Sequence, residues 1–173
     1  MQLRSAPAVL LCLLLLAGCA RPPPLEQPVD AETPMALNLW RSKMSRDLTT
    51  EDWRWFDVVI QEYKFQLMLA GKISGSAAID AAVRERIHGR ALGVVLREGL
   101  QAHLQRKTAE RDDMKTAFGR NEEKRALIKP GQDDLLRDLN FHQENLRQNL
   151  AKLEAELAAA QAALVRFENP ASR

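Results

Sequence analysis

The chain has 173 residues, of which 28% are charged, and its 25 basic and 23 acidic side chains nearly cancel. This balance argues against a nucleic-acid-binding protein, in which a clustered basic excess is expected. Its two cysteines, Cys12 and Cys19, both lie near the N-terminus. The sequence beyond Cys19 therefore excludes disulfides, thiol catalysis and cysteine-based metal sites.

An apolar run over residues 8–17 follows Arg4 and predicts a secretory signal. The run has about half of the ~20 residues that a membrane-spanning helix needs. It ends in Leu16-Ala17-Gly18-Cys19, which resembles the lipobox of bacterial prolipoproteins. An ordinary secretory signal, with Cys19 present by chance, is the alternative.

The lipobox resemblance implies that residues 1–18 are cleaved and that Cys19 becomes the lipidated N-terminus. Cys19 would carry a diacylglyceryl thioether and an amide-linked acyl chain such as palmitate, and several chains together anchor a protein stably. Ala20 stands where an Asp would resemble an inner-membrane retention signal. The resemblance thus favours the outer membrane, with the protein facing the periplasm.

Residues 19–34 contain the lipidated cysteine and a proline-rich stretch with five prolines. Because proline fixes φ and removes a hydrogen-bond donor, no folded element is expected in this stretch. We predict an extended tether that could reach up to about 45 Å from the membrane at ~3.1 Å per residue.

An all-α fold is predicted beyond the tether, beginning with a small helical domain over residues 35–99. Thr49 and Asp52 have the form of a capping box, so a helix should begin at Thr49 or Thr50 and stop near Gly71. A shorter helix packing on it is expected around residues 37–44. A third helix should follow residues 74–76. The amphipathic face of the central helix is formed by Trp53, Phe56, Ile60, Tyr63 and Leu67.

Residues 100–168 are predicted to form an antiparallel coiled-coil hairpin with its turn at 129–132, followed by a tail over 169–173. The second arm has apolar residues alternating at three- and four-residue steps, as in a coiled-coil seam. The first arm has a weaker seam, so the hairpin is either loosely packed or shared with a second copy or a partner helix. The seam of the second arm comprises Leu136, Leu139, Gln143, Leu146, Leu150, Leu153, Leu157, Ala160, Leu164 and Phe167.

Residues 48–99 are similar to small helical bacterial lipoproteins of unknown function. The resemblance lies in the acidic-capped helix and in the segment Ile87-His88-Gly89-Arg90-Ala91, which leads into another helix. Members of that group more often have Lys-Thr where this chain has Arg90-Ala91. The resemblance implies a helical fold and brings no activity with it.

Residues for catalysis or metal binding are not found in a suitable pattern, so we predict no cofactor, no metal site and no enzymatic activity. His88, His103 and His142 lack the i, i+4 spacing of a helical metal site and are expected to be solvated. Adjacent carboxylates such as Glu51 and Asp52 point in different directions on a helix, which suits capping rather than acid–base chemistry.

Trp55 is the candidate contact residue for a partner. It is rotated about 160° around its helix from Trp53. It either closes a second core surface against the Trp40 segment or is an exposed aromatic anchor, because tryptophan is common at interface hot spots.

The sequence as a whole predicts a lipid-anchored bacterial envelope protein with a structural or protein-interaction role. Its partners would be the membrane, through lipid on Cys19, and either itself or an envelope protein, through the coiled coil. The alternative function is a ligand-binding lipoprotein or an enzyme with a groove between its helices, in which a small apolar ligand lies beside the face of Trp53 and Phe56.

Overall fold

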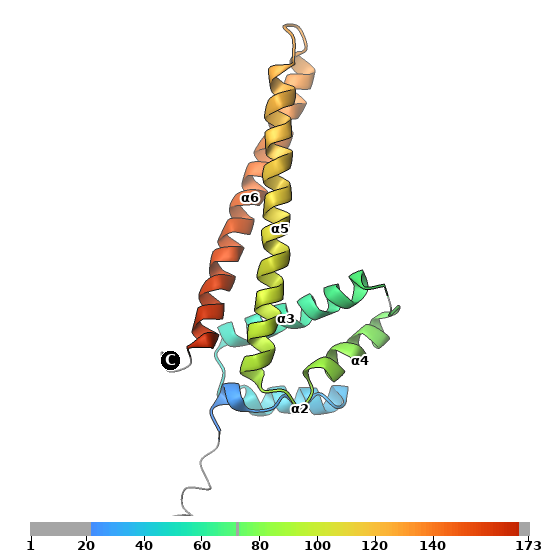
Figure 1. Cartoon of the computed structure of the whole chain (residues 1–173), viewed down its shortest axis with the longest axis vertical. Helices are drawn as coiled ribbons and strands as arrows, with labels where there is room; N and C mark the ends of the chain where they lie inside the picture. Colours follow the sequence, from blue (N-terminus) through green and yellow to red (C-terminus); the bar gives the residue numbers. More distant parts are fainter. Residues whose placement is uncertain (1–21, 72, 170–173) are drawn as a thin grey trace, which may run out of the picture.

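The computed structural model describes residues 22–71 and 73–169, and this part of the chain confirms the all-α prediction. Figure 1 shows α2, α3 and α4 gathered at one end of the molecule, with α5 and α6 projecting from them as an antiparallel helical hairpin. The elements are η2 (Pro24–Glu26), α2 (Pro34–Met44), α3 (Thr50–Leu69), α4 (Ser76–Ile87), α5 (Leu92–Ala126) and α6 (Asp133–Glu168).

Local signals fix the ends of α3, as the sequence predicts. The Thr49 hydroxyl accepts from the Asp52 N–H at 3.1 Å, and the Asp52 carboxylate accepts from the Thr49 N–H at 3.0 Å. This reciprocal capping box satisfies two donors that a helix start leaves unpaired. Beyond the other end of α3, Gly71 has a φ of +65°, which a residue with a side chain rarely adopts.

The proline-rich segment that follows Cys19 differs from the predicted extended tether, and that prediction is wrong for residues 22–34. Val29 donates its N–H to the Arg90 carbonyl at 2.9 Å and accepts from the Gly89 N–H at 2.8 Å, in the loop between α4 and α5. Each proline removes only its own donor, so the residues between prolines still pair. Four alternate residues of this segment are buried: Leu25, Gln27, Val29 and Ala31.

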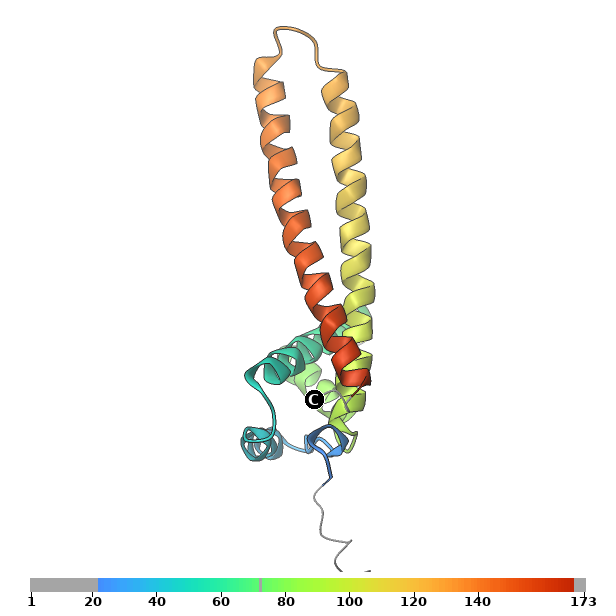
Figure 2. The same cartoon turned by 90° about the vertical axis from the view of Figure 1, so that its left-hand side faces the viewer.

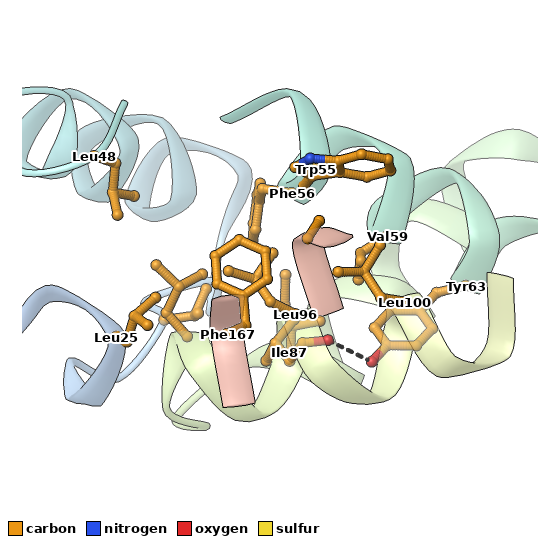
Figure 3. Packing of buried hydrophobic residues seen from close by; sticks show 14 of the residues in the cluster. Leu25, Leu48, Trp55, Phe56, Val59, Tyr63, Ile87, Leu96, Leu100 and Phe167 are labelled. Carbon is orange, nitrogen blue, oxygen red and sulfur yellow. Dashed lines mark hydrogen bonds between the residues drawn. The ribbon is translucent and has the colours of Figure 1, made fainter. Parts of the chain in front are cut away.

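One hydrophobic core joins the domain to the base of the hairpin (Figure 3). It contains α3 residues such as Phe56 and Val59, the first turns of α5, and the last turns of α6 from Ala160 to Phe167. The Tyr63 hydroxyl donates to the Val95 carbonyl at 3.2 Å, and burial raises the pKa of Tyr63. The base of the hairpin is therefore an integral part of the domain.

The hairpin seam follows the predicted pattern: every predicted seam residue of α6 is buried or half-buried. His103 and Lys107 of α5 both contact Glu156 of α6, so Leu104, which lies between them in the sequence, is opposite the same turn of α6. This register is the one that an antiparallel hairpin with its turn at 129–132 gives. The packing is compatible with a coiled coil. At 1.5 Å per residue, the 35 residues of α5 extend over about 52 Å.

Candidate functional site

A cluster of buried charged groups lies where the hairpin leaves the domain. Glu62 of α3 is 2% exposed and His103 of α5 is 4% exposed. Arg106 binds the Glu62 carboxylate with Nε, at 3.2 and 2.9 Å from its two oxygens, and with a terminal nitrogen at 2.8 Å. Buried charges are expensive unless they are paired, and this arrangement pairs them.

His103 connects the cluster to α6. Its Nδ1 lies 3.3 Å from Glu62 Oε2, and its Nε2 lies 3.2 Å from Glu156 Oε1, an ion-pair distance without hydrogen-bond alignment. Lys107 Nζ is 3.2 Å from the other Glu156 oxygen. The charged groups thus tie α3, α5 and α6 together at one level of the hairpin.

A cleft of about 990 Å³ opens beside this ionic cluster. Its apolar wall comes from α3 and α4 and includes Trp53, Phe65 and Ile79. Glu62, His103, Arg106, Lys107 and Glu156 also line it. A cleft with an apolar wall and a few converging polar groups is typical of small-molecule sites.

The buried carboxylate of the cleft is paired within the protein rather than directed at a ligand. Glu62 and Arg106 are engaged with each other, and the Arg106 guanidinium carbon also lies 4.7 Å from the centre of the Phe65 ring. A general base must reach the proton that it removes. Here the buried carboxylate of Glu62 is directed at the guanidinium and at His103.

The predicted contact residue Trp55 is not exposed, and its interpretation as an exposed anchor is wrong. It is 3% exposed and lies in the core beside Phe56 and Val59 (Figure 3). Its Nε1 donates to Glu51 at 3.4 Å. Trp55 shares its core with the last turns of α6, and Arg166 of α6 binds Glu51, one turn before Trp55. The local helix pattern could not show this return of α6 to the domain. The other predicted site residue, Cys19, lies outside the described residues.

The three histidines have different environments, and the prediction of a solvated His103 is wrong. His88 ends α4, and its Nδ1 accepts from the Ala31 N–H at 3.1 Å, so it fastens the proline-rich segment. His142 is exposed on α6. His103 falls on the buried side of α5 at the point where three helices meet, and its two glutamate partners, Glu62 and Glu156, are distant in sequence.

The outer part of the hairpin has no core of its own. None of residues 104–126 is buried, and Gln143 is the one buried residue of 133–152. Gln143 is 4% exposed, and its amide nitrogen and oxygen have no hydrogen-bond partner. Large apolar side chains on this part are exposed: Leu127, Leu135 and Phe141. Figure 2 shows the two arms continuing well beyond the domain.

Comparison of the chain with protein-family models, with curated proteins and with solved structures found no match. In residues 22–71 and 73–169, no helix has both the length and the apolar character needed to cross a bilayer. The same residues hold no group of three or more His, Cys, Asp or Glu side chains placed to bind a metal ion.

Proposed function

We propose that this chain is a lipid-anchored protein of the bacterial cell envelope with a structural or protein-interaction role and no catalytic activity. In this proposal the lipid is carried by Cys19, the protein resides on the outer membrane, and the domain faces the periplasm. The anchor is supported by the apolar run and by Leu16-Ala17-Gly18-Cys19.

The observation that carries the interaction role is the outer hairpin. Its two helices share only a half-buried seam, and Phe141 is 66% exposed on α6. Two helices alone bury little surface, and a further helix against this part would cover apolar side chains that now face solvent.

The lipid anchor is tested in cells. Cys19→Ala should abolish labelling by radioactive palmitate and release the protein from the membrane fraction. Continued labelling of that variant would contradict the anchor.

The interaction role is tested with a photo-crosslinking amino acid placed at Phe141, with Gln101 near the domain as the matched exposed position. We expect a discrete crosslinked product at 141 and none at 101. A protein that is monomeric by light scattering and gives no product at 141 would contradict the interaction role.

A second candidate function is the binding of a small ligand with an apolar body in the cleft. It is favoured by the volume of about 990 Å³ and by the polar groups along one side. The test is titration with an apolar fluorescent probe. Ile79→Lys, within the cleft, should abolish probe binding, whereas Ala81→Lys, exposed on the same helix, should preserve it. Equal binding by both variants would remove this candidate.

A further inference from the structure

The end of the molecule opposite the hairpin turn is formed by α2 and by the proline-rich segment. In Figures 1 and 2 both lie at the end farthest from the turn between α5 and α6. Pro22, the first described residue, adjoins η2 at this end. We use the name base face for the exposed surface made by residues 28, 30, 35, 39 and 43.

Two large apolar side chains are exposed on the base face. Met35 is 73% exposed and Leu39 is 66% exposed, and residues four apart on a helix are neighbours on its surface. Trp40 and Met44 of the same helix are buried, so the face that carries Met35 points away from the domain. Leu39 also lines a shallow hollow with Pro28, Asp30 and Lys43.

The distance between this face and a lipid on Cys19 is limited by the packing of the proline-rich segment. Because Leu25 to Ala31 pack against the domain, the sequence leaves two residues, Ala20 and Arg21, between Cys19 and the first described residue, Pro22. Three residue steps from Cys19 to Pro22 span at most about 11 Å. The headgroup layer on each side of the hydrocarbon is roughly 5–8 Å thick. Pro22 would therefore lie at or close to the headgroups, and the end of the molecule that carries the base face would lie on the same side, toward the bilayer (Figures 1 and 2).

We infer that the base face, through Met35 and Leu39, rests in the headgroup region of the phospholipid bilayer, with the hairpin directed away from it. This inference rests on the proposed lipidation of Cys19. The exposed charges of residues 26–46 include both signs: Glu26, Asp30 and Glu32 are acidic, and Lys43 and Arg46 are basic. The contact therefore depends on the apolar side chains and on the high local concentration that the anchor supplies, rather than on anionic lipid.

The hairpin turn is then held far from the membrane surface. The 35 residues of α5 place it about 52 Å beyond the start of that helix. The outer hairpin, with its exposed Phe141, would meet partners located in the periplasm rather than at the lipid surface to which the chain is anchored.

The test uses the full acylated chain, purified from membranes and reconstituted into vesicles of phosphatidylethanolamine and phosphatidylglycerol. Cys12 precedes the predicted cleavage site and Cys19 would be acylated, so an introduced cysteine is the single free thiol. Met35→Cys and Lys129→Cys are labelled with a fluorophore, and a quencher is attached to the lipid headgroups. We expect severalfold stronger quenching at 35 than at 129.

A control position and a measurement of palmitate incorporation separate the inference from the proposed anchor. Ala81→Cys, exposed on α4, reports whether the fluorophore itself draws a domain position to the lipid, and it should remain weakly quenched. Acylated protein with equal quenching at 35, 81 and 129 would overturn the inference and leave the anchor intact. A chain that incorporates no palmitate would overturn both.

Discussion

The close approach of α3 and α5 at Gly99 makes a specific prediction about stability. A Cβ added at Gly99 would lie 2.7 Å from one methyl carbon of Val59 and 2.9 Å from the Val59 Cβ. Carbon atoms need about 3.5–4.0 Å. Because Val59 is fully buried and its Cβ is part of the clash, rotation of its side chain does not remove it.

The magnitude follows from two opposing effects of Gly99→Ala. Alanine in a helix interior is favoured over glycine by about 1 kcal/mol. Overpacking of a close-packed core costs about 1–3 kcal/mol, and a clash with a fixed Cβ belongs at the upper end. We expect a net loss of about 2 kcal/mol in the free energy of unfolding, or roughly 4–8 °C in Tm for a chain of this size.

The measurement is urea unfolding of residues 20–173, followed by circular dichroism, and α5 supplies the control. An added Cβ at Gly119 meets nothing within 4 Å, so Gly119→Ala should stabilise the chain by about 1 kcal/mol. Val59→Ala combined with Gly99→Ala should show a favourable coupling of about 1 kcal/mol. Equal stabilisation by both glycine substitutions would refute the close approach of α3 and α5.

Three further predictions concern charged and polar groups. Arg106→Ala leaves the buried Glu62 without its guanidinium partner and should lower the free energy of unfolding, measured in urea, by about 2–3 kcal/mol. The control is Arg147→Ala, which breaks an exposed ion pair within α6 and should change the free energy of unfolding by less than about 0.5 kcal/mol. Gln143→Leu should stabilise the isolated chain by about 1–2 kcal/mol, because an unpartnered buried amide is replaced by an apolar side chain; a loss of stability would mean that Gln143 has a partner in solution. The hydrogen bond from Arg166, followed by the weaker effect of the hydrogen bond from Trp55, lowers the pKa of Glu51 in the folded chain. The ionised Glu51 therefore stabilises the fold at pH values above the ordinary carboxyl pKa, and this stabilisation is lost as the pH falls through the lowered folded pKa. Arg166→Gln should flatten this acid part of the curve of stability against pH, and an unchanged curve would contradict the assignment.

Much of the secondary structure could be predicted because its signals lie within a few residues of each other. Thr49 and Asp52 form the capping box, Gly71, Gly89 and Gly131 take positive φ at the breaks, and the seam of α6 repeats with a constant period. Each of these signals depends on local backbone geometry.

The burial of the proline-rich segment is not predicted by its prolines, which favour a free spacer. Residues 25–32 nevertheless alternate between buried and exposed positions, which is a strand-like period of two. The partner of this segment is the loop at residues 88–92, about 60 residues away in the sequence. No helix period or cap could identify that partner.

By itself, the sequence determined the helices, the hairpin turn at 129–132 and the half-buried seam, because backbone propensities and periodicity act over one or two turns. The tertiary structure decided which faces are covered. Trp55 is buried in a core that includes the last turns of α6. The meeting of α3, α5 and α6 buries His103 between two glutamates, and the loop after α4 fixes the proline-rich segment. These outcomes depend on contacts between distant segments, and such contacts form only when the whole chain packs.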